Sequence, residues 1–178
     1  MNLKVGIILG STREGRVSEA VGNWVLKNSK SIDDAEFEIV DIRDYDLPFL
    51  GTTEDMSNVS SWNKKLEELD AFIFVVAEYN HSITGALKNA LDLARDSWNN
   101  KSAGIVSYGA AGGARASEHL RGILSELQIA SVRSHVLLSL FDDFENHSEF
   151  KPRDMHTDNL NSLFVQVRDW GNALKTLR

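Results

Sequence analysis

The sequence predicts an α/β protein built on a doubly wound sheet of five parallel strands in the order 2-1-3-4-5, with helices on both faces. Two observations lead to this fold class. Five short segments are apolar or β-branched at nearly every position, which is typical of strands buried on both faces. The segments between them show helical spacing, and strand alternating with helix favours a parallel sheet with right-handed crossovers.

The expected elements follow one another without a long gap. The strands are predicted at residues 3–9, 37–42, 71–77, 102–108 and 132–138, and the helices at 18–28, 57–69, 85–98, 113–129 and 156–177. The helix at 85–98 is apolar on more than one stripe, whereas a sheet covers only one side. A second copy of the chain is the favoured cover for the other side, and the C-terminal helix of the same chain is the alternative.

Length and composition restrict the class of protein. The 178 residues suit one domain over 1–178, and the formal charge of −7 gives no electrostatic reason to bind nucleic acid or an anionic membrane. The absence of cysteine excludes disulfides and thiolate chemistry. With scattered histidines and an acidic segment at 141–150 expected to be solvated, no metal site is predicted. No apolar stretch approaches about 20 residues, and a cytoplasmic protein is expected.

In such sheets, ligands bind at the carboxyl ends of the strands, so the loops after strands 1, 3 and 4 are expected to converge. The first loop, residues 10–18, reads GSTREGRVS. The hydroxyls of Ser11, Thr12 and Ser18, together with the guanidinium groups of Arg13 and Arg16, suit a terminal phosphate at a helix N-terminus. An ordinary turn, with Ser18 as helix cap and solvated arginines, is the alternative interpretation.

The second loop, residues 77–85, reads AEYNHSITG. Glu78, Tyr79 and Asn80 stand at the end of a strand, where an aromatic side chain and free backbone groups suit a planar heteroaromatic ring. An Asn-containing turn with Tyr79 in the core is the alternative.

The third loop, residues 107–113, reads SYGAAGG. It offers a second aromatic, Tyr108, and glycines that allow close backbone approach. A tight turn without a ligand is the alternative here. Because a phosphate cradle and two aromatic platforms meet at one end of the sheet, the three loops together predict a site for flavin mononucleotide (FMN).

Three segments carry a resemblance to a known family. GSTREGR, EYNHSITGALKNALD and SYGAAGGARASEHLR resemble the NADPH-dependent FMN reductase family, flavodoxin-like enzymes that include quinone, azo-dye and chromate reductases. The resemblance spans residues 4–138. It implies an FMN phosphate surrounded by Ser11, Arg13, Arg16, Val17 and Ser18. It implies an isoalloxazine ring lined, largely through backbone groups, by Glu78, Tyr79 and Asn80, and flanked by Ser107, Tyr108, Gly109, Gly112 and Gly113.

The resemblance further implies an NAD(P)H-dependent FMN oxidoreductase that acts as a homodimer, with a tetramer as the alternative. NADPH or NADH would donate hydride, and a quinone, azo dye, metal oxyanion or free flavin would accept electrons. No side chain is assigned as catalytic acid or base, although His81 and Tyr108 are candidates to shape the acceptor pocket. A flavodoxin-type electron carrier and a cofactor-free interaction module are the competing functions.

Two positions depart from the family pattern. Ala77 and Thr84 stand where many members have proline. Proline restricts the backbone, so its absence predicts a more mobile second loop.

Overall fold

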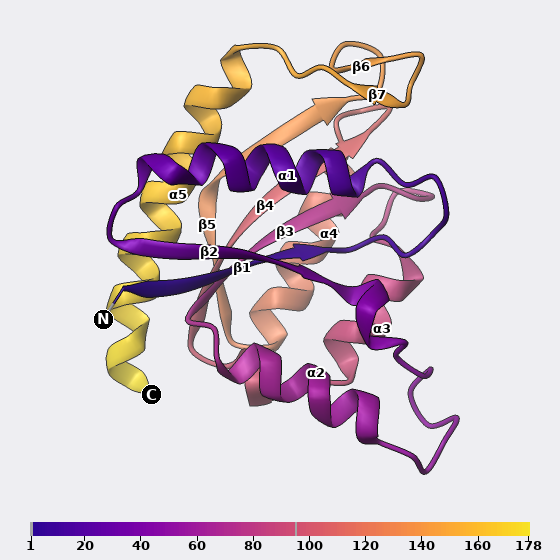
Figure 1. The fold of residues 1–178 in the computed structure, drawn as a ribbon, viewed down its shortest axis with the longest axis vertical. Helices are drawn as coiled ribbons and strands as arrows, with labels where there is room; N and C mark the ends of the chain where they lie inside the picture. Colours follow the sequence, from indigo (N-terminus) through magenta and orange to yellow (C-terminus); the bar gives the residue numbers. More distant parts are fainter. Residues whose placement is uncertain (1, 95) are drawn as a thin grey trace.

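A five-stranded parallel sheet forms the centre of the molecule in the computed structural model, which describes residues 2–94 and 96–178. Its order is β2-β1-β3-β4-β5, as the sequence predicts (Figure 1). The strands are β1 (Leu3–Leu9), β2 (Ala35–Asp41), β3 (Ala71–Ala77), β4 (Lys101–Gly109) and β5 (Ile129–Ser139). β1 and β3 have the predicted bounds, while β2, β4 and β5 begin earlier than predicted.

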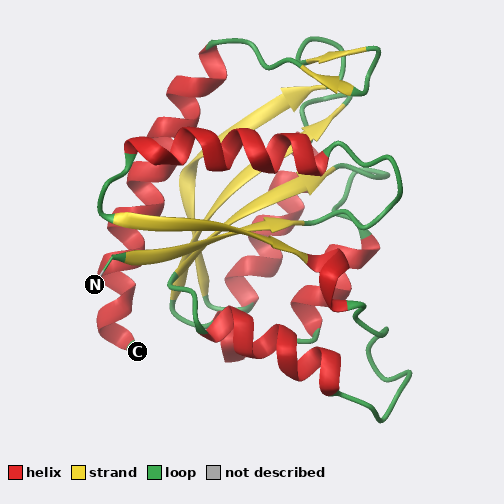
Figure 2. Cartoon of the chain, viewed as in Figure 1, coloured by secondary structure: helices red, strands yellow, loops and turns green. Residues whose placement is uncertain are grey.

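Helices cover both faces of the sheet and divide the core into two apolar layers (Figure 2). One layer lies under α1 (Ser18–Asn28) and α5 (Met155–Leu174). The other lies under α2 (Ser57–Glu67), α3 (Gly85–Asp92) and α4 (Ala114–Glu126). Short 3₁₀ segments at Ser29–Ser31, Ile42–Tyr45, Asp96–Trp98 and Lys175–Leu177 complete the helical structure.

The third helix is shorter than predicted, because α3 ends at Asp92 rather than at residue 98. At its C-terminal end, two backbone carbonyls accept hydrogen bonds from side chains. The indole of Trp62 donates to Ala90 O at 3.0 Å, and that of Trp98 donates to Leu91 O at 3.1 Å. These buried bonds satisfy carbonyls that further helical turns would otherwise use. Likewise, α4 ends before β5 begins at Ile129, a residue that the sequence assigned to the helix.

The second apolar stripe of α3 is covered within the same chain. Leu87, Ala90 and Leu91 are buried, and they belong to the core layer that contains Trp62 of α2 and Trp98. The C-terminal helix lies on the opposite face of the sheet, so it is not the cover. The stripe therefore gives no reason to expect a second copy of the chain.

The acidic segment at 141–150 is not simply a solvated loop, as the sequence suggested. It contains a two-stranded antiparallel hairpin, β6 (Phe144–Glu145) with β7 (Glu149–Phe150). Asp143 is fully buried, and its carboxylate accepts from Ser139 N at 2.8 Å and from Arg153 Nε at 3.0 Å. The hydrogen bonds from Arg153 and from backbone N–H groups outweigh burial and hold the pKa of Asp143 below its ordinary value.

At the amino edge of the sheet, where the parallel strands begin, charged side chains form hydrogen bonds and ion pairs with other residues of the chain. Asp70 accepts hydrogen bonds from Lys4 N at 3.0 Å, Lys175 Nζ at 2.7 Å and Arg178 at 3.1 Å. Both termini of the chain lie near this edge (Figure 1). Nearby, the buried ammonium of Lys101 donates to Leu66 O at 2.7 Å. The C-terminal 3₁₀ turn is thereby fastened to the start of the sheet.

Within residues 2–94 and 96–178, no helix is long and apolar enough to cross a membrane. The same residues contain no group of three or more His, Asp or Glu side chains placed to hold a metal ion.

Candidate functional site

The first loop opens at the end of β1 and presents unused donors. The backbone N–H groups of Ser11, Thr12 and Arg13 have no acceptor in the described chain, and the exposed guanidinium of Arg13 forms no ion pair there. Together with Tyr79 and Thr84 from the second loop, these three residues line a cavity of about 340 Å³. Adjacent free N–H groups beside a guanidinium form a site for an anion.

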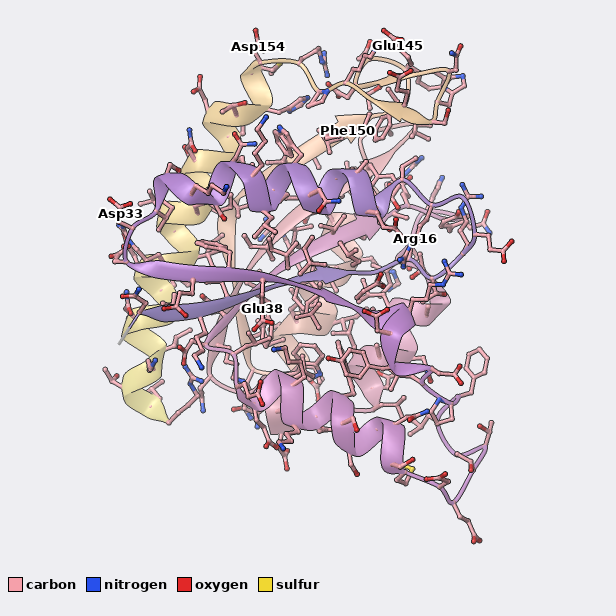
Figure 3. All side chains as sticks on the ribbon, viewed as in Figure 1. Arg16, Asp33, Glu38, Glu145, Phe150 and Asp154 are labelled. Carbon is pink, nitrogen blue, oxygen red and sulfur yellow. The ribbon has the colours of Figure 1, made fainter. Side chains whose placement is uncertain are left out.

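Arg16, only three residues further on, is used differently. Its Nε donates to Glu19 Oε1 at 3.0 Å, and one terminal nitrogen donates to Ser11 O at 2.6 Å and to Asp41 Oδ1 at 2.8 Å. The other terminal nitrogen bonds Glu19 and Asp41. All five N–H donors of this guanidinium are therefore occupied within the chain. Its side chain is 4% exposed, in the turn between β1 and α1 (Figure 3).

These contacts give Arg16 the geometry of a clamp. It joins the first loop to the end of β2 through Asp41 and to the first turn of α1 through Glu19. The hydrogen bonds to Asp41 raise the pKa of Arg16 above its ordinary value. Arg16 thus holds the loop in shape, while Arg13 keeps its donors available.

Ser18 and Tyr108 meet beneath the first loop. The Ser18 hydroxyl is buried with no hydrogen bond of good geometry in the described chain, so Ser18 does not cap α1 through its side chain. Burial raises the pKa of Tyr108 to about 12, against a smaller lowering by the hydroxyls of Ser18 and Ser11. Tyr108 therefore stays a neutral phenol at the base of the site. Val17, which precedes α1, packs on the apolar core.

The second loop folds into a two-residue hairpin. Tyr79 and Ser82 exchange both backbone hydrogen bonds at 2.9 Å, and the two residues between them, Asn80 and His81, have φ of 46° and 68°. This is the pattern of a type I′ turn, in which Asn suits the first central position and Gly, rather than His, is the preferred residue at the second. Tyr79 remains 44% exposed on the cavity.

Helix α4 holds this hairpin through two side chains one turn apart. Arg115 approaches His81 Nε2 at 2.9 Å, and His119 Nδ1 lies 2.6 Å from Ser82 Oγ. Because Arg115 is a donor only, His81 Nε2 must accept, which places the proton of a neutral ring on Nδ1. Contacts from α4 thus support a turn that would be unfavourable for His81 alone.

Glu78 links the second loop to the start of α4. Its carboxylate accepts from Arg115 N at 3.1 Å, Ala116 N at 3.3 Å and the guanidinium of Arg115. Gly113 precedes the helix and offers no side-chain cap, so Glu78 performs that task from another strand. These hydrogen bonds outweigh burial and hold the pKa of Glu78 below its ordinary value.

Thr84 stands where many family members have proline, and its side chain makes two hydrogen bonds that proline could not make. Its hydroxyl donates to Gly10 O in the first loop and accepts from Leu87 N at 3.0 Å, which caps α3. Thr84 therefore ties the first and second loops together, which supplies side-chain restraint where the sequence predicted greater mobility.

The third loop is built on close backbone packing. Ser107 Oγ donates to Gly112 O at 2.9 Å, so its side chain is used inside the loop. Gly113 has φ of 74°, and a Cβ there would lie 2.7 Å from Ser107 Cβ and 2.8 Å from Tyr108 N. At Gly109, a Cβ would lie 3.0 Å from Glu78 Cβ. Glycine at these positions lets the second and third loops meet.

A second cavity of about 510 Å³ adjoins the first on the side of β2. The two cavities share Thr12, Gly85 and Ala86, so they are parts of one cleft. The remaining lining comes from the end of β2 and the loop that follows it: Ile42, Arg43, Asp46, Leu47 and Phe49, with Asn89 from α3. Asn89 fixes this loop by donating to Pro48 O at 2.9 Å and accepting from Leu50 N at 3.0 Å.

The structure brings the sequence-predicted residues of the three loops to one edge, but their roles differ. Arg13 and Tyr79 line the first cavity, whereas the side chains of Arg16, Glu78 and Ser107 are occupied by contacts within the chain. Sequence reasoning missed the loop after β2, which carries no glycine-rich or aromatic signal at the strand end. The free N–H groups and Arg13 fit an FMN phosphate, and the exposed ring of Tyr79 fits a flavin.

A doubly wound sheet of this order, with free backbone N–H groups after β1 and the exposed Tyr79 after β3, defines a flavodoxin-like protein. Comparison with known proteins is more specific. A family model described as NADPH-dependent FMN reductase matches residues 3–143. The chain belongs to the NADPH-dependent FMN reductase family.

Individual relatives agree with this assignment. An NAD(P)H:quinone oxidoreductase of Solanum tuberosum is 41% identical over 131 residues, which cover 68% of this chain and 66% of the relative. An NAD(P)H-dependent FMN reductase of Saccharomyces cerevisiae is 32% identical over 145 residues, covering 71% and 76% of the two chains. Among solved structures, the flavoenzyme NAD(P)H:(acceptor) oxidoreductase FerB from Paracoccus denitrificans superposes with a TM-score of 0.77 at 20% identity, covering 96% and 98%.

Proposed function

We propose that this protein is an NAD(P)H-dependent FMN oxidoreductase that reduces a small acceptor of the quinone type. The anion cradle at Ser11–Arg13, which opens into the cavity beside Tyr79, is the observation that carries the proposal. Family membership and relatives named as FMN and quinone reductases support it. Bound FMN supplies the redox chemistry, namely hydride acceptance from a nicotinamide and electron delivery to the acceptor.

The residues of this chain bind and orient rather than transfer protons. Arg13 and the free N–H groups of Ser11 and Thr12 hold the phosphate, and Arg16 keeps the loop in place. Tyr79 and the backbone of Asn80 face the ring on a hairpin that Glu78 and α4 fix. No side chain needs to act as acid or base, which agrees with a neutral Tyr108 at the base of the site.

An anaerobic visible spectrum of the purified protein with FMN, before and after addition of NADPH, tests this function. We expect a protein-bound flavin band that bleaches far faster than free FMN. A bound band that NADPH and NADH leave unchanged would instead indicate a flavodoxin-type electron carrier. Absence of bound flavin at excess FMN would contradict the whole assignment and favour an interaction module.

We also propose that the protein is a cytoplasmic homodimer. The cytoplasm contains the reduced nicotinamide donors. A groove of about 360 Å³ between α3 and α4, lined by His119, Ile123 and Leu127 among others, offers a surface for a second copy. Light scattering at micromolar concentration tests the assembly: a dimer mass is expected, a monomer mass would contradict it, and a tetramer mass would extend it.

A further inference from the structure

We propose that the second cavity binds the adenosine end of NADPH, with Arg43 holding the 2′-phosphate. This inference rests on the proposed function, because it assigns the donor preference of the same cleft. It makes Arg43 the residue that distinguishes NADPH from NADH.

The charge at Arg43 is available to a ligand. Its backbone N–H donates to Asp41 Oδ1 at 3.0 Å, while its exposed guanidinium has no ion pair or hydrogen bond in the described chain. At the same edge of the sheet, Arg16, Arg115 and Arg153 all pair with carboxylates. Within residues 2–94 and 96–178, Arg13 and Arg43 are the two arginines that line the cleft, one in each cavity, and neither guanidinium forms an ion pair there.

Two free guanidinium groups match two separate phosphate monoesters. Arg13 is adjacent to the free N–H groups that suit the FMN phosphate. Arg43 lies beyond Thr12, which lines both cavities, and so is separated from that cradle along one continuous cleft. NADPH carries a 2′-phosphate monoester that NADH lacks, and a guanidinium fork suits its geometry.

The apolar part of the second cavity suits a purine. Phe49 is 71% exposed on its rim, and Ile42 and Leu47 form its wall. An exposed aromatic ring that Asn89 holds in place through Pro48 and Leu50 is a platform for stacking a base. Stacking on Phe49 would orient adenine, while Arg43 would read the phosphate.

Two acidic residues near Arg43 reduce the net positive charge of the second cavity. Asp46 lines it and Asp44 is adjacent in sequence, but neither forms an ion pair with Arg43. Carboxylates repel a phosphate and accept hydrogen bonds from the exocyclic amine of adenine. Asp46 is therefore suited to accept a hydrogen bond from the adenine amine, and Arg43 is suited to bind the 2′-phosphate.

Isothermal titration of the FMN-loaded protein with adenosine 2′,5′-bisphosphate and with 5′-AMP tests the assignment. We expect the bisphosphate to bind at least about tenfold more tightly, the usual worth of one hydrogen bond to a charged group. Arg43→Ala should remove that difference, and Phe49→Ala should weaken both ligands alike. Arg133→Ala, which changes an exposed arginine on β5 that also lacks an ion pair, is the matched control.

Steady-state kinetics provide the second measurement. Arg43→Ala should raise KM for NADPH about tenfold relative to KM for NADH, because only NADPH carries the 2′-phosphate. Selectivity that persists in Arg43→Ala, or a bisphosphate that FMN displaces because it binds at Arg13, would overturn the inference. Failure of the proposed function looks different, since neither nicotinamide would then reduce the bound flavin of the wild-type protein.

Discussion

The two edges of the sheet differ in how completely their charged side chains are paired. At the amino edge, Asp70 is paired with Lys175 and Arg178, and the ammonium of Lys101 is buried against a carbonyl. At the carboxyl edge, Arg16, Arg115 and Arg153 pair with carboxylates, whereas the guanidinium groups of Arg13 and Arg43 have no partner among the described residues and line a cleft. The paired charges stabilise the fold, and the two unpaired guanidinium groups that line the cleft are the ones proposed to bind ligands.

The same distinction appears within one loop. Arg13 and Arg16 are of the same type and three residues apart, yet all donors of Arg16 are occupied, whereas the Arg13 guanidinium has no acceptor in the part of the chain that the structure describes. If this comparison is correct, replacing Arg16 should affect stability and replacing Arg13 should affect binding. Four substitutions test the comparison, from the largest expected effect to the smallest.

Arg16→Ala should lower the free energy of unfolding by about 3 kcal/mol, because it leaves the mostly buried carboxylate of Asp41 without its partner. Urea denaturation monitored by circular dichroism measures the change. Arg13→Ala should stay within about 0.5 kcal/mol of the wild type in the same experiment. Equal destabilisation by both substitutions would remove the distinction between the two arginines.

Arg13→Ala should weaken FMN binding by about 1.5–3 kcal/mol, the usual worth of a hydrogen bond to a charged group. Quenching of flavin fluorescence in an equilibrium titration gives the dissociation constant. Arg133→Ala should bind FMN as the wild type does. A folded Arg13→Ala protein with unchanged affinity would show that the phosphate binds elsewhere.

Asp70→Asn should lower the free energy of unfolding at pH 7 by about 1–2 kcal/mol, because the ion pairs with Lys175 and Arg178 are lost. Burial opposes ionisation of Asp70, but hydrogen bonds from Lys175 and Lys4 N outweigh it, so its pKa lies below the ordinary value. Its contribution is therefore complete above the unfolded pKa of about 3.9 and disappears as the pH falls through the lower folded pKa.

Denaturation of the wild type and Asp70→Asn over pH 2–7 tests this assignment. The difference between them should shrink toward zero at the acid end. A difference that does not change with pH would show that Asp70 acts through packing rather than through its charge.

Lys101→Met should raise the free energy of unfolding at pH 7 by about 1 kcal/mol, since it removes a buried charge while keeping most of the side-chain volume. Burial lowers the pKa of Lys101 to about 8. Between this value and the unfolded value of about 10.4, the unfolded chain binds more protons, so wild-type stability should rise with pH. Thermal melts at pH 7–10.5 should show this rise in the wild type and a flatter profile in Lys101→Met.

Much of the fold could be predicted from the sequence because strand burial leaves a local pattern. The bounds of β1 and β3 follow from runs that are buried at nearly every position. The end of α3 could not be predicted, because the indoles that bind its carbonyls come from Trp62 on another helix and from Trp98. Asp143 was predicted as a solvated acid because the burial of its carboxylate depends on a hairpin whose two-residue strands leave no pattern in the sequence.

The candidate site likewise has features that could be predicted from the sequence and features that could not. The position of the first loop in the cleft follows from the order of its residues along the chain, while its role as a phosphate site stays a prediction. The difference between Arg13 and Arg16 could not, because it depends on Asp41 at the end of β2. The second cavity was missed altogether, since Arg43 and Phe49 join the cleft only through the neighbouring position of β2 in the sheet.

The Arg16 clamp also bears on the speed of ligand capture. Four hydrogen bonds from Arg16 tie the loop to Asp41 of β2 and Glu19 of α1, and a fifth goes to Ser11 O within the loop. We therefore expect the loop to hold its shape before a ligand arrives. Association then needs no preceding rearrangement, so stopped-flow traces should be single exponentials. Their rate constants should rise linearly with FMN concentration, with a slope in the ordinary range of about 10⁵–10⁷ M⁻¹s⁻¹. Releasing the clamp would introduce a slow ordering step and a plateau at high concentration.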